Sequence, residues 1–307
     1  MTIPKLSQSS SGLGGRGYKA IFEDGQPVLP SITTCLGALD KPGLVDWHVR
    51  QTAAFAVTHV DDLLSRTEEA GMRYLQYTSR RKPKNWDDPE IDVYNAAQYV
   101  LDDLSNTGDW IHNFIEDDLM GRFPAAPLRS DHEEMADAYL SWKDDHDIEV
   151  IATERTVFGN GYAGTADLFA KIDGVVYCVD HKSSRKVHES HIAQLAAVGA
   201  AHTSAREVSE GTEGSVYYKL QPKVAEAHAG QVDSWWVPEP VPDFQAYGVL
   251  QIRPMDYTQS GEVIEPFCEL HTIPQDQIDA GFKLFNAGLA ARMAQAELKN
   301  LEKESAK

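Results

Sequence analysis

The chain is poor in cysteine and has no long apolar run. Its 307 residues include only three cysteines, Cys35, Cys178 and Cys268, and no CxxC pair. An odd number of widely spaced cysteines supports neither a disulfide framework nor a zinc or iron–sulfur site. The N-terminus also lacks the charged-then-apolar order of a secretory signal. We therefore expect a cytoplasmic protein with no membrane-spanning segment and no iron–sulfur cluster.

Basic residues are scarce as well, with 28 Lys and Arg against 47 Asp and Glu and a net charge of −19. This balance argues against a protein that coats nucleic acid by electrostatic attraction. It does not exclude a nuclease, because an active site needs only a local positive strip and bound metal ions supply positive charge. One candidate strip, which is equally well interpreted as a solvated loop, consists of Arg80, Arg81, Lys82 and Lys84 before Trp86.

The order of apolar patterns and turn residues predicts one α/β domain over residues 19–302, preceded by a disordered Ser/Gly-rich tail over 1–18. We expect a central mixed β-sheet flanked by helices, with a helical N-terminal part. The predicted parts are a helical segment at 30–147, a core at 148–202, a partly ordered insertion at 203–244, and late strands with a C-terminal helix at 245–302.

Periodic apolar positions define the individual elements. Helices are predicted at 44–64, 92–120, 131–145, 189–201 and 275–301. Strands are predicted at 149–157, 246–254 and 265–273, in addition to a hairpin between the first of these and the helix at 189.

That hairpin, GTADLFAKIDGVVYCVDHKSS, is the most informative stretch of the chain. Asp-Gly between two β-rich runs is the strongest short-range hairpin signal. If Asp173 and Gly174 are the turn residues, the numbers of opposed residues add up to 347, and Asp167 lies across from Asp180. Lys182 lies two residues after Asp180, so its side chain should point to the same face.

Both faces of the predicted hairpin are largely apolar, as in a central strand pair covered on two sides. An exposed cross-strand ion pair, the alternative interpretation, would instead show polar residues alternating along one face. Facing carboxylates among apolar neighbours destabilise a fold unless they are paired. A divalent cation between Asp167 and Asp180 would remove that penalty, so the pattern favours a functional site.

These residues resemble a known family. Asp167, then Asp180-His181-Lys182, then Gln194 in the next predicted helix resemble the PD-(D/E)XK nuclease superfamily. The resemblance is greatest to its RecB-like branch, which includes the CRISPR-associated RecB-like exonucleases and related phage proteins.

Further upstream residues support the resemblance. The segment GDWIH, which contains His112 and leads to Glu116, resembles the helical motif that carries the branch's metal-binding histidine. Glu154 falls in a strand just ahead of the approach to Asp167, and residues 30–47 resemble the entry segment of phage-type members. Val198 stands where the branch often has an aromatic residue. The scattered cysteines favour the phage-type members without an iron–sulfur cluster.

The resemblance implies a restriction-endonuclease-like fold and one or two Mg²⁺ or Mn²⁺ ions. It implies that Asp167 and Asp180 bridge the metal, with the backbone carbonyl of His181 as a further ligand. Lys182 would orient or deprotonate the attacking water, and Gln194 would hold the lysine or the DNA backbone.

Three residues have less defined roles. His112 becomes an additional ligand if the resemblance holds, and an imidazole would shift the preference toward Mn²⁺. Glu116, one turn further along, either supports the histidine or is simply exposed. Glu154 either reaches a metal through water or caps the sheet.

The expected function is a metal-dependent DNA exonuclease that acts on single- or double-stranded ends in phage-type recombination, replication or repair. A phage-encoded chain would work in the host cytoplasm, with a recombination or replication protein as partner. The alternatives are a structure-selective endonuclease with the same site, an inactive nuclease fold that binds DNA or protein, and a metal enzyme that does not cleave DNA.

Overall fold

The computed structural model describes residues 6–8, 15–39, 42–70, 93, 95–220, 233–258 and 260–305. Its contacts divide the chain into two compact units rather than the single predicted domain. One unit combines Met1–Leu39 with Trp110–Lys307, and the other is Asp40–Asp109. All of the predicted site residues belong to the first unit.

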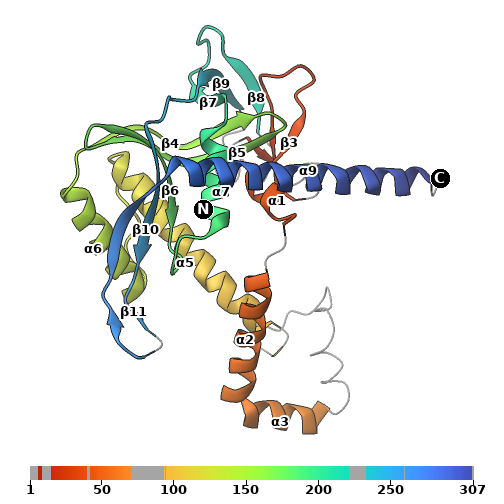
Figure 1. Cartoon of the computed structure of the whole chain (residues 1–307), viewed down its shortest axis with the longest axis vertical. Helices are drawn as coiled ribbons and strands as arrows, with labels where there is room; N and C mark the ends of the chain where they lie inside the picture. The colour runs from red at the N-terminus through yellow and green to blue at the C-terminus, as the bar shows by residue number, and fades with distance from the viewer. Residues whose placement is uncertain are drawn as a thin grey trace. The chain divides into compact units, whose positions relative to one another are not determined.

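An eight-stranded sheet in the order β13-β10-β6-β5-β4-β7-β9-β8 forms the centre of the first unit (Figure 1). In chain order these strands are β4 (Ile148–Gly159), β5 (Tyr162–Ile172), β6 (Val175–Lys182), β7 (Thr203–Val208), β8 (Val216–Lys219), β9 (Asp233–Pro240), β10 (Ala246–Arg253) and β13 (Phe267–Ile273). Strands β6 and β10 run parallel, and the remaining neighbours are antiparallel. The predicted α/β class with a mixed central sheet is confirmed.

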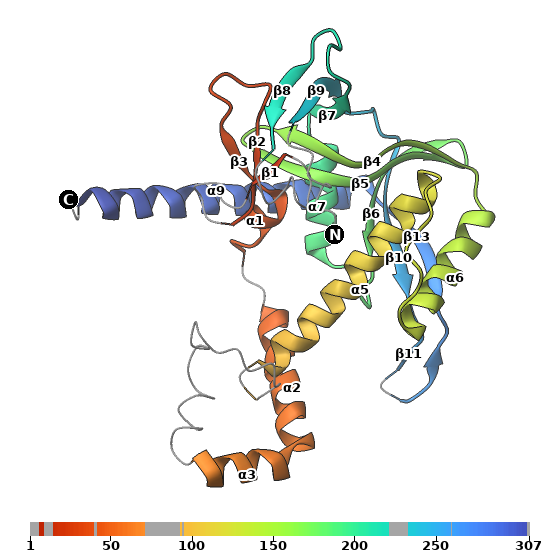
Figure 2. The ribbon, with the colours of Figure 1, turned by 180° about the vertical axis from the view of Figure 1, so that it is seen from behind.

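Helices cover both faces of this sheet (Figures 1 and 2). One face packs against α1 (Ile32–Leu36), α7 (Glu189–Gly199) and the first part of α9 (Gln275–Ser305). The other packs against α6 (Ser130–Asp144) and the C-terminal part of α5 (Ala96–Leu119). This arrangement explains the apolar character of both hairpin faces.

The hairpin itself forms in the predicted register. Both turn residues have positive φ, 49° at Asp173 and 87° at Gly174, as a two-residue type I′ turn requires. Strands β5 and β6 pair from Ile172↔Val175 to Leu168↔Val179, and these pairs add up to the predicted sum.

Two predictions about irregular segments are corrected by the structure. The predicted tail contains β1 (Ser7–Gln8) and β2 (Gly17–Lys19), which form a small sheet with β3 (Val28–Pro30). Tyr18 is fully buried there, because its ring packs on the core through contacts that a local Ser/Gly-rich composition does not reveal.

The predicted insertion at 203–244 supplies β7, β8 and β9, which extend the central sheet. Gly211 and Gly214 lie between β7 and β8, whereas Pro238 and Pro240 lie within β9. Ser234 and Trp236 alternate with less buried neighbours along β9. Tertiary pairing therefore organises the described parts of a segment whose composition predicted only a partly ordered insertion.

The predicted helix at 44–64 is in fact two helices, α2 (Pro42–Thr58) and α3 (Val60–Ala70). Both belong to the second unit. A short ribbon of β11 (Asp256–Tyr257) and β12 (Val263–Ile264) completes the first unit. Among the helices that the structure describes, none combines the length and apolarity needed to cross a bilayer.

Candidate metal and catalytic site

Three acidic residues occupy facing positions on three adjacent strands. Continuing the β5–β6 pairing one step beyond Leu168↔Val179 sets Asp167 opposite Asp180. On its other side, Asp167 faces Glu154, because the β4–β5 ladder pairs the residues immediately before and after this position. The sheet therefore brings Glu154, Asp167 and Asp180 into one row.

The β5–β6 ladder ends at Leu168, and the next residue, Asp167, contacts β6 through its side chain instead of its backbone. Its Oδ2 atom accepts a hydrogen bond from the backbone N–H of His181 at 2.8 Å. The same oxygen lies 3.7 Å from Nδ1 of His112 on α5. The structure thus brings the predicted histidine and the first predicted acid together.

Asp180 is bound by the two other predicted residues. Nζ of Lys182 lies 2.6 Å from Oδ2 of Asp180, which confirms that the two side chains share a face. Nε2 of Gln194 on α7 donates to Oδ1 of Asp180 at 2.9 Å. The glutamine therefore holds the acid rather than the lysine. Lys182 also donates to the backbone carbonyl of His181 at 3.1 Å.

Glu154 has an unusual backbone conformation for a strand residue. Its φ of 44° lies in the left-handed region, which costs a non-glycine residue about 1–3 kcal/mol and is found preferentially at functional sites. Burial first, and then the carboxylates of Asp167 and Glu116, raise the pKa of Glu154 well above its ordinary value. A cation bound nearby would offset both the cost of burying the Glu154 charge and its repulsion by the other carboxylates.

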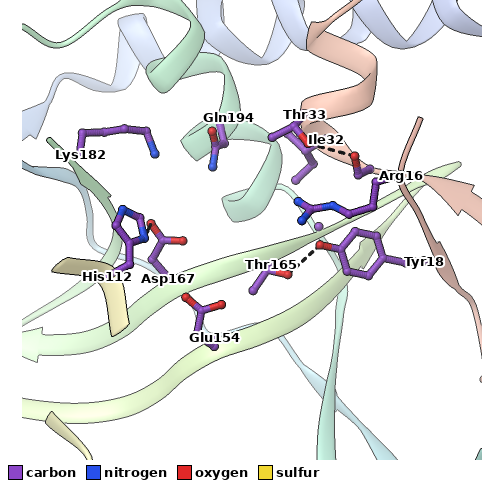
Figure 3. Close-up of a pocket in the computed structure, with 12 residues that line it drawn as sticks. Arg16, Tyr18, Ile32, Thr33, His112, Glu154, Thr165, Asp167, Lys182 and Gln194 are labelled. Atoms are coloured by element: carbon purple, nitrogen blue, oxygen red, sulfur yellow. Dashed lines mark hydrogen bonds and ion pairs between the residues drawn. The ribbon is translucent and has the colours of Figure 1, made fainter. Parts of the chain in front are cut away.

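Most of the predicted site residues line one pocket of about 150 Å³, whereas Asp180 is buried and does not line it. Figure 3 shows Glu154, Asp167, Lys182 and Gln194 arranged around the same space, with His112 beside Asp167. The opposite wall, which the sequence prediction missed, is formed by the N-terminal segment and the start of α1: Arg16, Tyr18, Ser31, Ile32 and Thr33.

Long-range contacts hold this wall in place. The Tyr18 hydroxyl lies 2.8 Å from Oγ1 of Thr165 (Figure 3). The backbone carbonyl of Arg16 accepts hydrogen bonds from the Ser31 N–H and the Thr34 hydroxyl. No motif near residue 16 signals this role; the only sequence indication is an isolated Arg-x-Tyr within a Gly-rich stretch.

The pKa values of the two acids and the lysine are shifted in different directions. Burial raises the pKa of Asp167, but His112 and Lys182 outweigh it, so this pKa is lowered overall. Burial is also the main cause that raises the pKa of Asp180, to about 7, despite the nearby lysine. Burial lowers the pKa of Lys182, but its carboxylate neighbours outweigh it and raise that pKa overall. Asp167 and Lys182 are therefore charged at neutral pH, and Asp180 titrates near it.

The raised pKa of Asp180 predicts a pH-dependent stability in the metal-free protein. A carboxyl group of this kind stabilises the fold below its unfolded pKa and loses that contribution as pH rises through the folded value of about 7. Asp180→Asn cannot ionise. We therefore expect its free energy of unfolding, relative to wild type, to increase between about pH 5 and about pH 8. Urea denaturation in EDTA measures this difference.

Asp256→Asn is the matched control. Burial raises the pKa of Asp256, but the Tyr257 N–H, Arg185 and Arg253 outweigh it, so this pKa is lowered overall and its contribution is lost only on acidification below its unfolded pKa. Arginine does not titrate in this range. The difference between this variant and wild type should not change over the same pH range. A flat difference for Asp180→Asn as well would contradict the prediction.

Two other predicted features are not part of the pocket. The Glu116 carboxylate pairs with Arg122 at 2.9 Å and does not line the pocket. The basic cluster at residues 80–86 lies outside the described residues.

The side chain of His181, and not only the predicted backbone carbonyl, lies close to the other candidate metal ligands. One ligand atom each from His112, Asp167 and His181 lies within 4.8 Å of the others. The His181 side chain is only 3% exposed. Burial lowers its pKa to about 3, so the imidazole is neutral at physiological pH and able to bind a metal.

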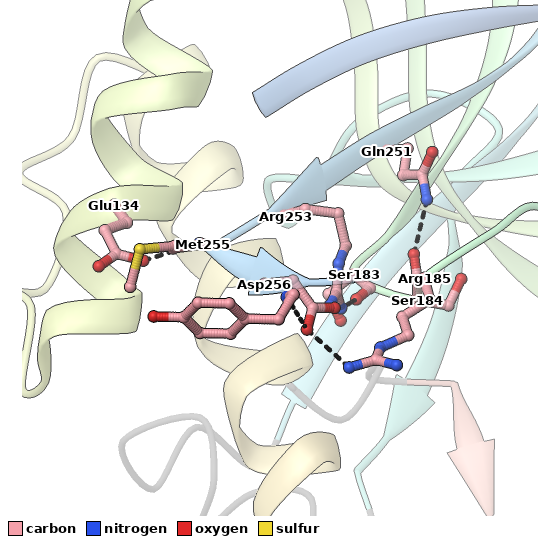
Figure 4. A network of polar contacts seen from close by, with 9 residues as sticks. Glu134, Ser183, Ser184, Arg185, Gln251, Arg253, Met255 and Asp256 are labelled. Carbon is pink, nitrogen blue, oxygen red and sulfur yellow. Dashed lines mark hydrogen bonds and ion pairs between the residues drawn. The ribbon is translucent and has the colours of Figure 1, made fainter. Parts of the chain in front are cut away.

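A network of polar contacts anchors the loop that follows Lys182 (Figure 4). The carbonyls of Ser183 and Ser184 accept hydrogen bonds from Arg253 and Gln251 of β10, respectively. Asp256 pairs with Arg253 at 2.7 Å and with the third loop residue, Arg185, at 2.6 Å. The backbone that carries Lys182 is therefore fixed from the adjacent strand.

Arg253→Met should lower the free energy of unfolding by about 1.5–3 kcal/mol, because it removes charge-assisted hydrogen bonds from a partly buried carbonyl and carboxylate. Urea denaturation tests this. Arg206→Met is the control, since Arg206 is 48% exposed where it pairs with Glu239 and such a pair contributes less than about 1 kcal/mol. Equal losses in both variants would show that the contacts of Arg253 contribute no more to the free energy of unfolding than an exposed ion pair does.

Comparison of the chain with models of protein families finds no match, and comparison with curated protein sequences also finds none. The function is therefore argued from the site itself.

Proposed function

We propose that this protein is a metal-dependent nuclease that hydrolyses phosphodiester bonds in DNA, and that it acts as an exonuclease. The observation that carries the proposal is the convergence of two buried acids, a lysine and a glutamine. Asp167, Asp180, Lys182 and Gln194 come from two strands and a helix, yet they lie in direct contact or on one pocket. Their order along the chain resembles the PD-(D/E)XK nucleases of the RecB-like branch.

The chemistry of the residues fits phosphodiester hydrolysis. A divalent ion at Asp167 and His112 would neutralise the phosphate and make the attacking water more acidic. Lys182, which is charged, would orient that water or stabilise charge in the transition state. Gln194 keeps Asp180 in place through its hydrogen bond. Glu154 adds a third acid beside Asp167.

The pocket also has features suited to an anionic substrate. Arg16 and Lys182 line it from opposite sides (Figure 3), and the Thr165 hydroxyl, which lies 2.8 Å from the Tyr18 hydroxyl, adds a polar group to its lining. Such contacts would offset the repulsion that an overall charge of −19 exerts on DNA. A recombination or replication partner would bring further affinity for DNA.

The test is digestion of end-labelled linear DNA, single- and double-stranded, with Mg²⁺, Mn²⁺ or EDTA. We expect nucleotides to be released from ends when metal is present and no cleavage in EDTA. A closed circular DNA in parallel separates the alternatives, because its cleavage would assign an endonuclease with the same site.

Absence of cleavage with every metal would contradict the proposal. If DNA binding persisted in that case, measured by fluorescence anisotropy, the protein would be a nuclease fold that serves as a binding module. Metal binding without DNA binding or cleavage would assign a metal enzyme of another class.

A further inference from the structure

We propose that His181 binds metal through its imidazole ring rather than its backbone carbonyl, so that His112, Asp167 and His181 together select a first-row transition-metal ion over Mg²⁺. This inference rests on the proposed function and specifies the cofactor of the same site.

The geometry of the three side chains suits a single ion. One ligand atom from each lies within 4.8 Å of the others. Bonds of about 2.0–2.2 Å at tetrahedral angles place two ligand atoms on one ion about 3.3–3.6 Å apart. Nδ1 of His112 and Oδ2 of Asp167 are already 3.7 Å apart, so the set would have to contract by about 1 Å, chiefly at His181. The rings of His112 and His181 lie at 75° with centroids 5.4 Å apart, so they approach from different directions.

The His181 ring has an unsatisfied atom. Its Nε2 is buried and has no hydrogen-bond partner among the residues that the structure describes. A buried polar nitrogen without a partner is rare and costs free energy. Coordination of a metal by this ring would account for its burial among the strands and α5.

The backbone and Asp180 oxygen atoms that could bind Mg²⁺ are contacted by other groups. Lys182 contacts both the His181 carbonyl and Oδ2 of Asp180, and Gln194 donates to Oδ1 of Asp180. Mg²⁺ prefers an octahedral shell of oxygen ligands. Two imidazoles with one carboxylate, in contrast, form a donor set that suits transition metals.

The position of the three ligands also fits a catalytic ion. His112 and Asp167 line the pocket, whereas His181 is buried and does not line it. The protein ligands would therefore occupy the buried side of the ion and leave its open positions toward Lys182 and Glu154.

The test is calorimetric titration of the full-length, metal-free chain with Co²⁺, Mn²⁺ and Mg²⁺. We expect wild type to bind Co²⁺ at least about tenfold more tightly than Mg²⁺, and His181→Phe to lose at least about tenfold in Co²⁺ affinity. His202→Phe is the matched control, because His202 is exposed and bonds to the adjacent Thr203; its affinities should equal those of wild type.

A second measurement applies if His181→Phe does not fold, as judged by circular dichroism. Pulsed EPR of wild type loaded with Mn²⁺ should detect nitrogen couplings from two imidazoles. A single coupled imidazole, or an unchanged Co²⁺ affinity in folded His181→Phe, would overturn the proposal.

The outcomes separate this inference from the proposed function. DNA cleavage with Mg²⁺ that is independent of the His181 ring would refute the imidazole ligand and leave the nuclease intact. Binding of Co²⁺ through both histidines without any DNA cleavage would support the metal site and refute the nuclease.

Discussion

Lys182→Met is expected to reduce metal-dependent DNA cleavage by about 10²–10⁴-fold, the usual contribution of a positioned acid–base group. The lysine is the charged group nearest Asp180, at 2.6 Å, and it lines the pocket beside Asp167. Methionine has a similar length but cannot orient water or stabilise negative charge. The measurement is the single-turnover rate on end-labelled linear DNA with saturating Mn²⁺.

The control for this variant is Lys171→Met on the same hairpin. Lys171 is 47% exposed and lies 3.7 Å from Glu149, so its loss should leave the rate within about threefold, since exposed ion pairs contribute little. Binding of DNA, measured by anisotropy, should fall far less than the rate in Lys182→Met. A rate close to that of wild type in Lys182→Met would remove the lysine from the reaction.

Asp167→Asn is expected to abolish both tight metal binding and cleavage. This carboxylate is the only acid in the candidate group with His112 and His181, and its lowered pKa keeps it ionised. Asparagine preserves the hydrogen bond from the His181 N–H but removes the charge that holds a cation. Metal affinity should fall by more than about 100-fold, beyond the 10–100-fold typical of groups that only support a ligand.

Calorimetry with Mn²⁺ measures this loss, and circular dichroism verifies that the variant is folded. Asp173→Asn serves as the control, because Asp173 occupies the hairpin turn and bonds to His146 and Asp147 away from the pocket. Metal affinity that survives in Asp167→Asn would place the ion elsewhere, and the nuclease proposal would then lose its catalytic centre.

The sequence by itself determined the features that depend on local physics. Asp173 and Gly174 specify a tight turn because both need positive φ. The turn sets the register, and the register with a two-residue period sets Asp167, Asp180 and Lys182 on one face. Helices such as α6 and α7 follow from their apolar period in the same way.

Tertiary structure decided which distant groups complete the site. Glu154 faces Asp167 only because β4 pairs with β5 across an irregularity between Val150 and Ala152, and no local pattern reports such a shift. Arg16 reaches the pocket through hydrogen bonds to the start of α1.

The contacts that the lysine and the histidine make also depend on the tertiary fold. The sequence places Lys182 beside Asp180, but the packing of α7 adds a hydrogen bond from Gln194 to the same carboxylate. Packing of α5 then brings His112 to the ring of His181. Residue types and spacing therefore identified the acids and the lysine, whereas contacts between segments far apart in the chain decided which atoms of the candidate site other residues already hold.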